Sequence, residues 1–500
     1  MLIATLPDPE VTDLGVAAGA ASRHADLLEI RLDLLPEERR SRLAELAARL
    51  PRPWIAACRR RGDGGLYEGG EEDRLALLRR GAAAGAAWID VEHGTAAGAL
   101  IGKVPGVRFL LSHHDHHAFP ADLAGLVRQM AMTPGVAMLK VAVRADDVRD
   151  NLKVRELLAG RTTPIPLAAF CLGEAGQISR ILALAWGGAA TYGCGGRQAV
   201  AAGQIPVADL NLCYRVRSIG SDTVLTGVLG WPVGHSLSPR VHNAAFAALD
   251  LDFVYLPIAS SAILPACELA RALPLHALSV TRPYKRAIVE HLDDLEPLAR
   301  RIGAVNTVLC DGGRRFGLNT DASGGIEPLR SRLRLAGLPV AIVGAGGAAR
   351  ALAAALSGEG ARVKVFGRNP ERVESMARDL GVEFAPLAAL AAEPYRLLVQ
   401  ATPVGQSPAI TELPVPADWL RGDLIYDLVY TPRPTRLLRE AAARGIPTLD
   451  GLEMFLAQAA EQFHLFTDRE PPLAVMRQAA LAALDSGSAP PLAVEGESIG

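Results

Sequence analysis

The stretch VAIVGAGGAARALAAAL, residues 340–356, runs from an apolar strand through a glycine-rich turn into an alanine-rich helix. A dinucleotide-binding unit requires this order, because the tight turn places a pyrophosphate at the helix N-terminus. Gly344 would make the turn, Gly346 would let the pyrophosphate approach, and Ala349 stands where a third glycine is common. The motif predicts a βαβ unit that begins at residues 338–343, although such a turn can also be a plain strand–helix connector.

The end of the next expected strand, residues 362–366, bears on the choice of dinucleotide. An NAD-binding unit carries a carboxylate there for the ribose hydroxyls, whereas this chain has Gly367, Arg368 and Asn369. A guanidinium can hold the extra phosphate of NADP through two parallel hydrogen bonds, and Arg372 is near enough to add a contact. The sequence therefore predicts NADP, with a solvated turn arginine as the alternative.

The first 215 residues contain eight apolar, strand-like runs that alternate with helical stretches. This count is typical of a (β/α)8 barrel, although periodicity alone would also permit an open doubly wound sheet. The runs span residues 2–6, 27–34, 54–58, 87–91, 107–111, 136–143, 165–171 and 189–194.

Composition narrows the classes of protein to which the chain can belong. At about 100–200 residues per domain, 500 residues predict two to four domains. Lys plus Arg number 52 against 54 for Asp plus Glu, so no basic field is expected to hold nucleic acid or an anionic membrane. The longest apolar runs fall far short of the ~20 residues of a membrane span, and the start MLIATLPDPE predicts no signal peptide. Six scattered cysteines without a CxxC pair predict a reducing, cytoplasmic setting.

Polar residues at the ends of the barrel runs are candidates for chemistry, because barrel enzymes place their sites there. Lys140 lies within the sixth run among apolar neighbours, which would lower its pKa and make its amine a nucleophile for a ketone. The alternative is a lysine that extends to the barrel rim. His113 and His114 follow the fifth run, and adjacent strand residues point to opposite faces, so one general base is expected rather than a metal site.

Five motifs of the first half resemble type I 3-dehydroquinate dehydratase, over roughly residues 1–213. They are LEIRLD at 28–33, SHHDHHAFP at 112–120, MLKVAV at 138–143, GQISR at 176–180 and AAGQIPVADL at 201–210. The resemblance implies a metal-free barrel in which Lys140 forms an iminium with the substrate ketone and His114 removes a proton from the adjacent carbon. It implies substrate contacts by Glu29, Arg31, Arg59, Arg180 and Gln204. The sequence departs from the family pattern at two places: Val200 and Ala202 occupy a loop that usually carries a serine, and Asp63 replaces a glutamate.

Motifs of the second half resemble shikimate dehydrogenase from about Val224 to Ala483. They are GWPVGHSLSP at 230–239, SVTRPYK at 279–285, GAVNTV at 303–308, GLNTDASG at 317–324, QATPVG at 400–405, YDLVYTP at 426–432 and LDGLEMFLAQAAEQF at 449–463. A lysine and a carboxylate in one cleft are a sensible pair for moving a proton during hydride transfer, and the resemblance assigns that role to Lys285 and Asp321. It assigns the substrate carboxylate to Ser236 and Ser238, and the ring hydroxyls to Thr281, Asn306, Tyr430 and Gln458.

The same resemblance implies cofactor contacts on the glycine turn, after the second strand and on two later loops. They would come from Gly344, Ala345, Gly346, Gly347, Ala348, Arg368, Asn369, Arg372, Leu428 and Gly451. The sequence departs from the family pattern at Ser279 and Gln400, which stand where asparagine is common.

Together these features predict an α/β chain with an N-terminal (β/α)8 barrel followed by a two-domain dehydrogenase with a Rossmann NADP-binding domain. The expected boundaries are a barrel over 1–215, a linker over 216–223, a substrate domain over 224–335 completed by helices over about 452–485, an NADP domain over 336–451, and a disordered tail over 486–500. The predicted function is dehydration of 3-dehydroquinate followed by NADPH-dependent reduction to shikimate.

Two alternatives to this function are a catabolic, NAD-using quinate/shikimate dehydrogenase fused to a dehydratase and a regulatory homologue without turnover. Arg368 argues against the first. Retention of both proton-transfer pairs argues against the second. Small-molecule substrates are the expected partners, without nucleic acid or membrane, and both a monomer and an oligomer remain open.

Overall fold

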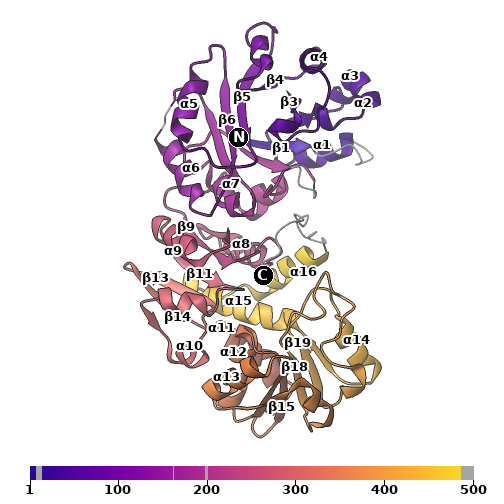
Figure 1. Ribbon diagram of the computed structural model, residues 1–500, viewed down its shortest axis with the longest axis vertical. Coiled ribbons are helices and arrows are strands. Elements are labelled where there is room, and N and C mark those ends of the chain that lie inside the picture. Colours follow the sequence, from indigo (N-terminus) through magenta and orange to yellow (C-terminus); the bar gives the residue numbers. More distant parts are fainter. Residues whose placement is uncertain (7–13, 161–162, 197–200, 486–500) are drawn as a thin grey trace.

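The structure is a computed structural model that describes residues 1–6, 14–160, 163–196 and 201–485. Figure 1 shows three units one after another along the long axis of the molecule: a barrel, a mixed sheet with its helices and a second α/β unit. The expected tail over 486–500 and Val200 lie outside the described residues.

The eight predicted runs of the first half all form strands of one parallel sheet. Its order is β7-β6-β5-β4-β3-β2-β1-β8, a nearly closed barrel, because β8 pairs with β1 and follows directly after β7 in the chain. The run 27–34 is shorter than predicted and turns into a 3-10 segment at Leu32–Leu34, while the fifth strand is longer and includes both histidines. The strands are β1 (Leu2–Leu6), β2 (Leu27–Arg31), β3 (Trp54–Ala57), β4 (Trp88–Glu92), β5 (Arg108–Asp115), β6 (Met138–Arg144), β7 (Leu167–Leu172) and β8 (Thr191–Cys194).

Helices flank the barrel and bury their apolar faces against the outer side of the strands. Leu77 and Leu78 of one helix and Val127 and Met130 of another lie in the buried core that surrounds the sheet. The helices are α1 (Leu14–Ser22), α2 (Glu37–Ser41), α3 (Leu43–Ala47), α4 (Glu71–Ala83), α5 (Leu123–Ala131), α6 (Asp150–Ala159) and α7 (Gln177–Leu182).

The second sheet is mixed, in the order β10-β9-β11-β13-β14-β12. Its first three strands are parallel, whereas β13 runs antiparallel to both of its neighbours. The strands are β9 (Val224–Gly230), β10 (Phe253–Ala259), β11 (Leu275–Val280), β12 (Asp294–Leu295), β13 (Thr307–Asp311) and β14 (Arg314–Leu318), with helices α8 (Ser238–Ala248), α9 (Ile263–Ala272), α10 (Pro297–Ile302) and α11 (Thr320–Arg330).

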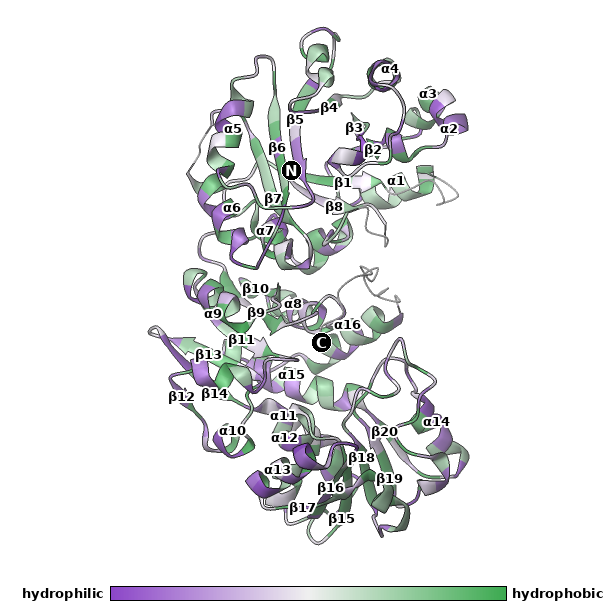
Figure 2. Cartoon of the chain, in the orientation of Figure 1, coloured by the Kyte–Doolittle hydropathy of each residue, from purple (hydrophilic) through white to green (hydrophobic). Residues whose placement is uncertain are grey.

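The third sheet is parallel, in the order β17-β16-β15-β18-β19-β20. Numbered within the unit this is 3-2-1-4-5-6, the order of a Rossmann fold, which binds dinucleotides between its first and fourth strands. Figure 2 shows these strands mostly in green, as expected for a sheet that helices cover on both faces. The strands are β15 (Pro339–Val343), β16 (Arg362–Gly367), β17 (Glu383–Pro386), β18 (Leu397–Gln400), β19 (Leu424–Asp427) and β20 (Thr448–Asp450), with helices α12 (Gly347–Gly358), α13 (Pro370–Leu380) and α14 (Arg436–Ala443).

Two C-terminal helices, α15 (Gly451–Thr467) and α16 (Leu473–Asp485), return to the second sheet, drawn in yellow across it in Figure 1. Phe463 and Met476 of these helices share a buried cluster with Phe246 of α8 and Tyr255 of β10. Residues near the end of the described chain therefore complete the buried core against the second sheet.

The barrel and the second sheet share buried apolar surface. Val254, Leu256 and Ile258 alternate along β10 and belong to the same buried cluster as Ile178 and Ile181 of α7. The intervening segment 216–223 is packed as well, since Val216 and Ile219 are buried in that cluster. Arg217 adds an ion pair with Asp26, with 2.9 Å between the nearest atoms.

Candidate active sites

Lys140 lies on β6 inside the barrel and is 2% exposed. Its Nζ lies 2.8 Å from Oε1 of Glu29 on β2 and 3.7 Å from Oδ2 of Asp90 on β4. The guanidinium of Arg59 contacts the same two carboxylates, at 2.9 and 3.3 Å. Two cations and two carboxylates from four parts of the sheet thus meet in one buried cluster.

The charges of this cluster set the protonation of its members. Burial and the charge of Arg59 lower the pKa of Lys140 to about 8, although Glu29 and Asp90 oppose the shift. Burial would raise the pKa of Glu29, but Lys140 and Arg59 hold it below its usual range. The prediction of a lowered lysine pKa is confirmed in direction, and the second cation contributes as well as the apolar surroundings.

The two adjacent histidines of β5 occupy opposite environments, as strand alternation requires. His114 is buried inside the barrel, and neither of its ring nitrogens has a hydrogen-bond partner among the described residues. Burial and the charges of Arg59 and Lys140 keep the pKa of His114 well below its usual value. His113 is only partly buried. A neutral ring with free nitrogens beside a lysine can accept a proton from a bound molecule.

Arg180 on α7 is 1% exposed and has no ion-pair partner among the described residues. Its guanidinium stacks over the ring of Phe170 at 4.4 Å, and its Nε has no hydrogen-bond partner. Burial lowers the pKa of Arg180 to about 10. A buried cation without a counter-charge is a site where an anionic group of a ligand gains the most.

The remaining candidate residues of the barrel differ in their hydrogen-bond and ion-pair partners. Arg31 is occupied by Asp33 through a bidentate ion pair, at 2.9 and 2.6 Å. Gln204 lies in the loop after β8, where its Oε1 accepts a hydrogen bond from Ala201 N. Asp63, the shortened acidic residue, pairs with Arg60 at 2.6 Å. Sequence reasoning missed Tyr192, whose ring lies 3.8 Å from Lys140 Nζ.

Lys285 and Asp321 form a second candidate site at the edge of the second sheet. Lys285 Nζ donates to Asp321 Oδ2 over 2.5 Å, and Asp321 is buried. Asn306 donates to the other carboxylate oxygen of Asp321 at 3.0 Å. The structure therefore brings the lysine and the carboxylate into one hydrogen-bonded group.

Helix α15 brings Gln458 into this group. Its Oε1 lies 3.4 Å from Asn306 Nδ2. The approach depends on Gly324 of α11, because a Cβ there would lie 2.7 Å from the Gln458 Cβ. The ring of Tyr430 packs against Phe455 of the same helix, and Thr281 follows β11 with its N–H bonded to Leu229 O.

The two candidate serines lie at the start of α8. Ser238 is buried and its N–H lies 3.3 Å from Ser236 Oγ. A buried chain of hydrogen bonds runs behind them, from Tyr255 Oη to Ser279 Oγ at 2.6 Å and from there to Gln462 Oε1 at 2.7 Å. Ser279, in the place of the common asparagine, thus has an internal role, and sequence reasoning missed Tyr255 and Gln462.

The glycine turn lies beside the second site. Gly344 has φ +127°, and a Cβ there would lie 2.8 Å from Ala401 O, so the turn requires glycine. Gly346 is exposed with open space where a Cβ would be, while a Cβ on Gly347 would lie 3.1 Å from Lys285 Cδ. Ala345 and Ala348 are half-buried. The open turn at the N-terminus of α12 fits a pyrophosphate and adjoins Lys285.

The loops after β18 and β19 surround this turn. Gln400 is buried and binds the Thr402–Val404 backbone through its amide, so the replacement of asparagine still braces the loop. Leu428 N donates to Gln400 O at 3.0 Å. Gly451 is required at the start of α15, because a Cβ there would lie 2.1 Å from Leu428 O.

Arg368 follows β16 at the same edge of the sheet. Its side chain is exposed, and none of the described residues forms an ion pair with it. Asn369 caps α13 by accepting a hydrogen bond from Arg372 N at 3.1 Å. This cap engages the side-chain oxygen of Asn369, while the side chains of Arg368 and Arg372 are exposed to solvent.

Comparison with known proteins decides the family. A protein from Arabidopsis thaliana named bifunctional 3-dehydroquinate dehydratase/shikimate dehydrogenase, chloroplastic, is 36% identical over an alignment 476 residues long, which covers 90% of this chain and 78% of that protein. The chain belongs to this bifunctional family.

Four family models match successive parts of the chain. The type I 3-dehydroquinase model matches residues 3–221, and the shikimate dehydrogenase substrate binding domain matches 228–308. The model of an NADP oxidoreductase, coenzyme F420-dependent, matches 339–422, and the shikimate 5'-dehydrogenase C-terminal domain matches 451–481.

Relatives of the second half alone agree with this family. A shikimate dehydrogenase (NADP(+)) from Salinibacter ruber is 41% identical over 52% of this chain and 98% of its own length. A crystal structure of a shikimate dehydrogenase in complex with NADP+ is 34% identical, covers 53% of this chain and 97% of its own, and superposes with a TM-score of 0.50. The second half of the chain therefore has the fold of a solved shikimate dehydrogenase.

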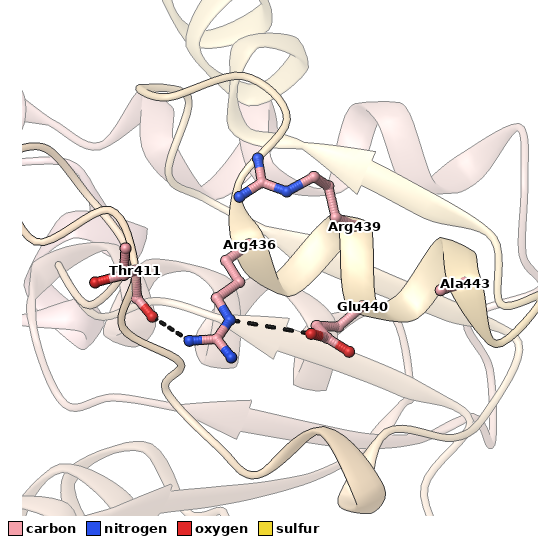
Figure 3. A pocket seen from close by; sticks show the side chains of 5 residues that line it. All are labelled: Thr411, Arg436, Arg439, Glu440 and Ala443. Atoms are coloured by element: carbon pink, nitrogen blue, oxygen red, sulfur yellow. Dashed lines mark hydrogen bonds and ion pairs between the residues drawn. The ribbon is translucent and has the colours of Figure 1, made fainter.

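Other features of the described residues add no site to these two. A surface pocket of about 400 Å³ lies on α14, where Arg436 contacts Thr411 O and Glu440 (Figure 3). None of the five residues that line this pocket belongs to either candidate site described above. The described residues contain no group of three or more His, Cys, Asp or Glu that could hold a metal, and no described helix is long and apolar enough to cross a membrane.

Proposed function

We propose that the chain dehydrates 3-dehydroquinate to 3-dehydroshikimate in the barrel and reduces that product to shikimate with NADPH in the second half. The observation that carries this function is the presence of both reaction centres in one chain: the buried Lys140 cluster and the Lys285–Asp321 pair beside an open glycine turn. Membership of the bifunctional family supports both activities.

In the barrel, the Lys140 amine attacks the substrate ketone, and loss of water leaves an iminium. His114 takes a proton from the adjacent carbon, and the iminium accepts the electron pair that is released. The hydroxyl β to the iminium then leaves as water, with a proton returned by His114, and hydrolysis of the iminium regenerates the lysine. Glu29 positions Lys140 by their ion pair before the reaction, and Arg59 in turn holds Glu29.

Binding of the first substrate is assigned to the cations around this cluster. Arg180 takes the carboxylate, because it is the buried guanidinium without a counter-charge among the described residues. Arg31, Arg59, Glu29 and Gln204 contact the hydroxyl groups.

In the second half, NADPH supplies a hydride to the ketone carbon when it is bound at the glycine turn. Lys285 and Asp321 hold and deliver the proton at the ketone oxygen, since they form one hydrogen-bonded pair. Ser236 and Ser238 bind the substrate carboxylate, and Thr281, Asn306, Tyr430 and Gln458 hold its hydroxyls. The turn Gly344–Ala348, together with Leu428 and Gly451, frames the nucleotide.

A coupled assay tests the two-step function. Adding 3-dehydroquinate and NADPH to the purified chain is expected to oxidise the cofactor and yield shikimate, identified by mass. Addition of 3-dehydroshikimate in place of 3-dehydroquinate isolates the second step. Cofactor oxidation with 3-dehydroshikimate but not with 3-dehydroquinate would contradict the dehydratase, and the absence of oxidation with 3-dehydroshikimate would contradict the reductase.

Arg368 is proposed to read the extra phosphate of NADP. Hydrogen bonds to charged groups contribute roughly 1.5–3 kcal/mol each, so Arg368→Ala is expected to weaken NADPH binding by about one to two orders of magnitude. NADH binding is expected to stay nearly unchanged, because its ribose carries no phosphate. Cofactor titrations of both forms measure the effect.

The matched control for this prediction is Arg362→Ala, an exposed arginine at the opposite end of β16. It is expected to change neither titration. Equal losses for both cofactors in the Arg368 variant, or a preference of the unaltered chain for NADH, would show that another group reads the phosphate. A preference for NADH would also favour the catabolic alternative.

A reducing compartment such as the cytoplasm is proposed for the chain. All six cysteines are free, and three of them are buried in the barrel half, which fits a setting where disulfides do not form. The domain boundaries proposed are 1–215, 224–335 with 452–485, and 336–451, because each range contains one sheet and its helices.

A further inference from the structure

The barrel half supplies a carboxylate to the loop that leads into α8. Glu174 lies just after β7, and its Oε1 accepts hydrogen bonds from Val233 N at 2.8 Å and Gly234 N at 2.6 Å. These two N–H groups belong to the dehydrogenase half. The two hydrogen bonds therefore join residues that are 59 and 60 positions apart in the chain.

The bonded loop runs directly into the two candidate serines. Ser236 N donates to Val233 O at 2.9 Å, which closes a turn over residues 233–236, and Ser236 Oγ in turn lies 3.3 Å from Ser238 N. The position of Val233 thus sets that of both hydroxyl groups. Loop N–H groups held by a charged acceptor are fixed more strongly than those held by water.

Glu174 is itself anchored on the barrel. Asn151 of α6 donates to the neighbouring Ala175 O at 2.7 Å and accepts from Ser179 N at 2.9 Å. On the other side, Gly173 N donates to Ala202 O at 3.0 Å. Hydrogen bonds on both sides therefore fix the turn that carries Glu174. Its carboxylate can hold the bonded loop in a defined position.

We propose that Glu174 is a positioning residue for the dehydrogenase, contributed by the barrel, which fixes the loop carrying Ser236 and Ser238. The inference rests on the proposed role of these serines in binding the substrate carboxylate. It means that the second substrate site is complete only when the barrel is docked against it.

Kinetics of shikimate oxidation with NADP+ in the full chain test this role. Glu174→Ala removes both acceptor contacts and is expected to raise the KM for shikimate about tenfold, which corresponds to about 1.4 kcal/mol. The kcat and the KM for NADP+ are expected to stay within about twofold, because Glu174 is not among the residues placed near the reacting atoms or cofactor. Glu174→Gln keeps the shape and one acceptor oxygen, so a smaller rise is expected.

The matched control is Glu268→Gln on α9. It removes another contact between the halves, the exposed ion pair with Arg149 at 2.8 Å, but does not touch the serine loop. We expect no change in the KM for shikimate. An equal rise in this control would overturn the proposal, since docking of the halves in general would then explain it.

Ser236→Ala separates failure of this inference from failure of the serine assignment. If Ser236→Ala raises the KM for shikimate and both Glu174 variants leave it unchanged, the positioning role is wrong. If Ser236→Ala has no effect while Glu174→Ala raises the KM, the loop is positioned as proposed and the serine role is wrong. A loss of kcat at unchanged KM in Glu174→Gln would also contradict the proposal.

Discussion

Replacing Lys140 with alanine is expected to abolish dehydration of 3-dehydroquinate and to leave shikimate oxidation unchanged. The amine is the group that would form the iminium, and no other lysine shares its buried cluster with Glu29, Arg59 and Asp90 among the described residues. Separate assays of the two reactions, on the same preparation of the variant, measure the outcome. Retained shikimate oxidation also shows that the dehydrogenase half of the variant is folded.

Borohydride trapping adds a direct readout of the same lysine. Reduction in the presence of 3-dehydroquinate is expected to leave a covalent adduct on the peptide that contains Lys140, and none in the alanine variant. Because the pKa of Lys140 is lowered to about 8, the neutral, reactive amine gains population as the pH rises through that value. An adduct on a different lysine, or unchanged dehydration in the variant, would sink the assignment.

His114→Ala is expected to slow dehydration by ~10²–10⁴-fold, the range of a lost general acid–base group. His113→Ala is expected to have a much milder effect, because His113 lies on the opposite face of β5 and is only partly buried. Steady-state rates with 3-dehydroquinate compare the two variants.

The pair of histidine variants is its own control, since the two residues are adjacent on one strand. Similar losses in both would indicate damage to β5 rather than loss of a base. Inhibition of the unaltered chain by a chelator would favour a metal site, and we expect no inhibition.

The fold could be predicted from the sequence where it depended on the number of strand-like runs or on the spacing of residues in a motif. The eight runs of the first half and the glycine turn at 340–356 predicted the barrel and the Rossmann unit, and both are present. The ends of the strands shifted because local turns compete with apolar patterning, as at Leu32–Leu34, where the chain leaves the strand three residues before the run ends.

The candidate residues could be located, but their contacts could not. Lys140 stood out as a cation among apolar neighbours, yet its pairing with Glu29 joins residues 111 apart in the chain, which no local pattern encodes. Ser279 looked like a weakened motif and is instead one link in a buried chain of hydrogen bonds. Glu174 carried no signal, because its partners are backbone groups of another domain.

The buried apolar surface that α7 and β10 share determines what would follow if the gene that encodes the chain were divided. Dividing that gene near residue 220 would give one product with Ile178 and Ile181 uncovered and another with Val254 and Leu256 uncovered. Newly exposed apolar patches of this kind promote aggregation, so each product would need compensating polar substitutions before it could be made alone. A cell that carries the fused gene thus synthesises the two halves in equal numbers.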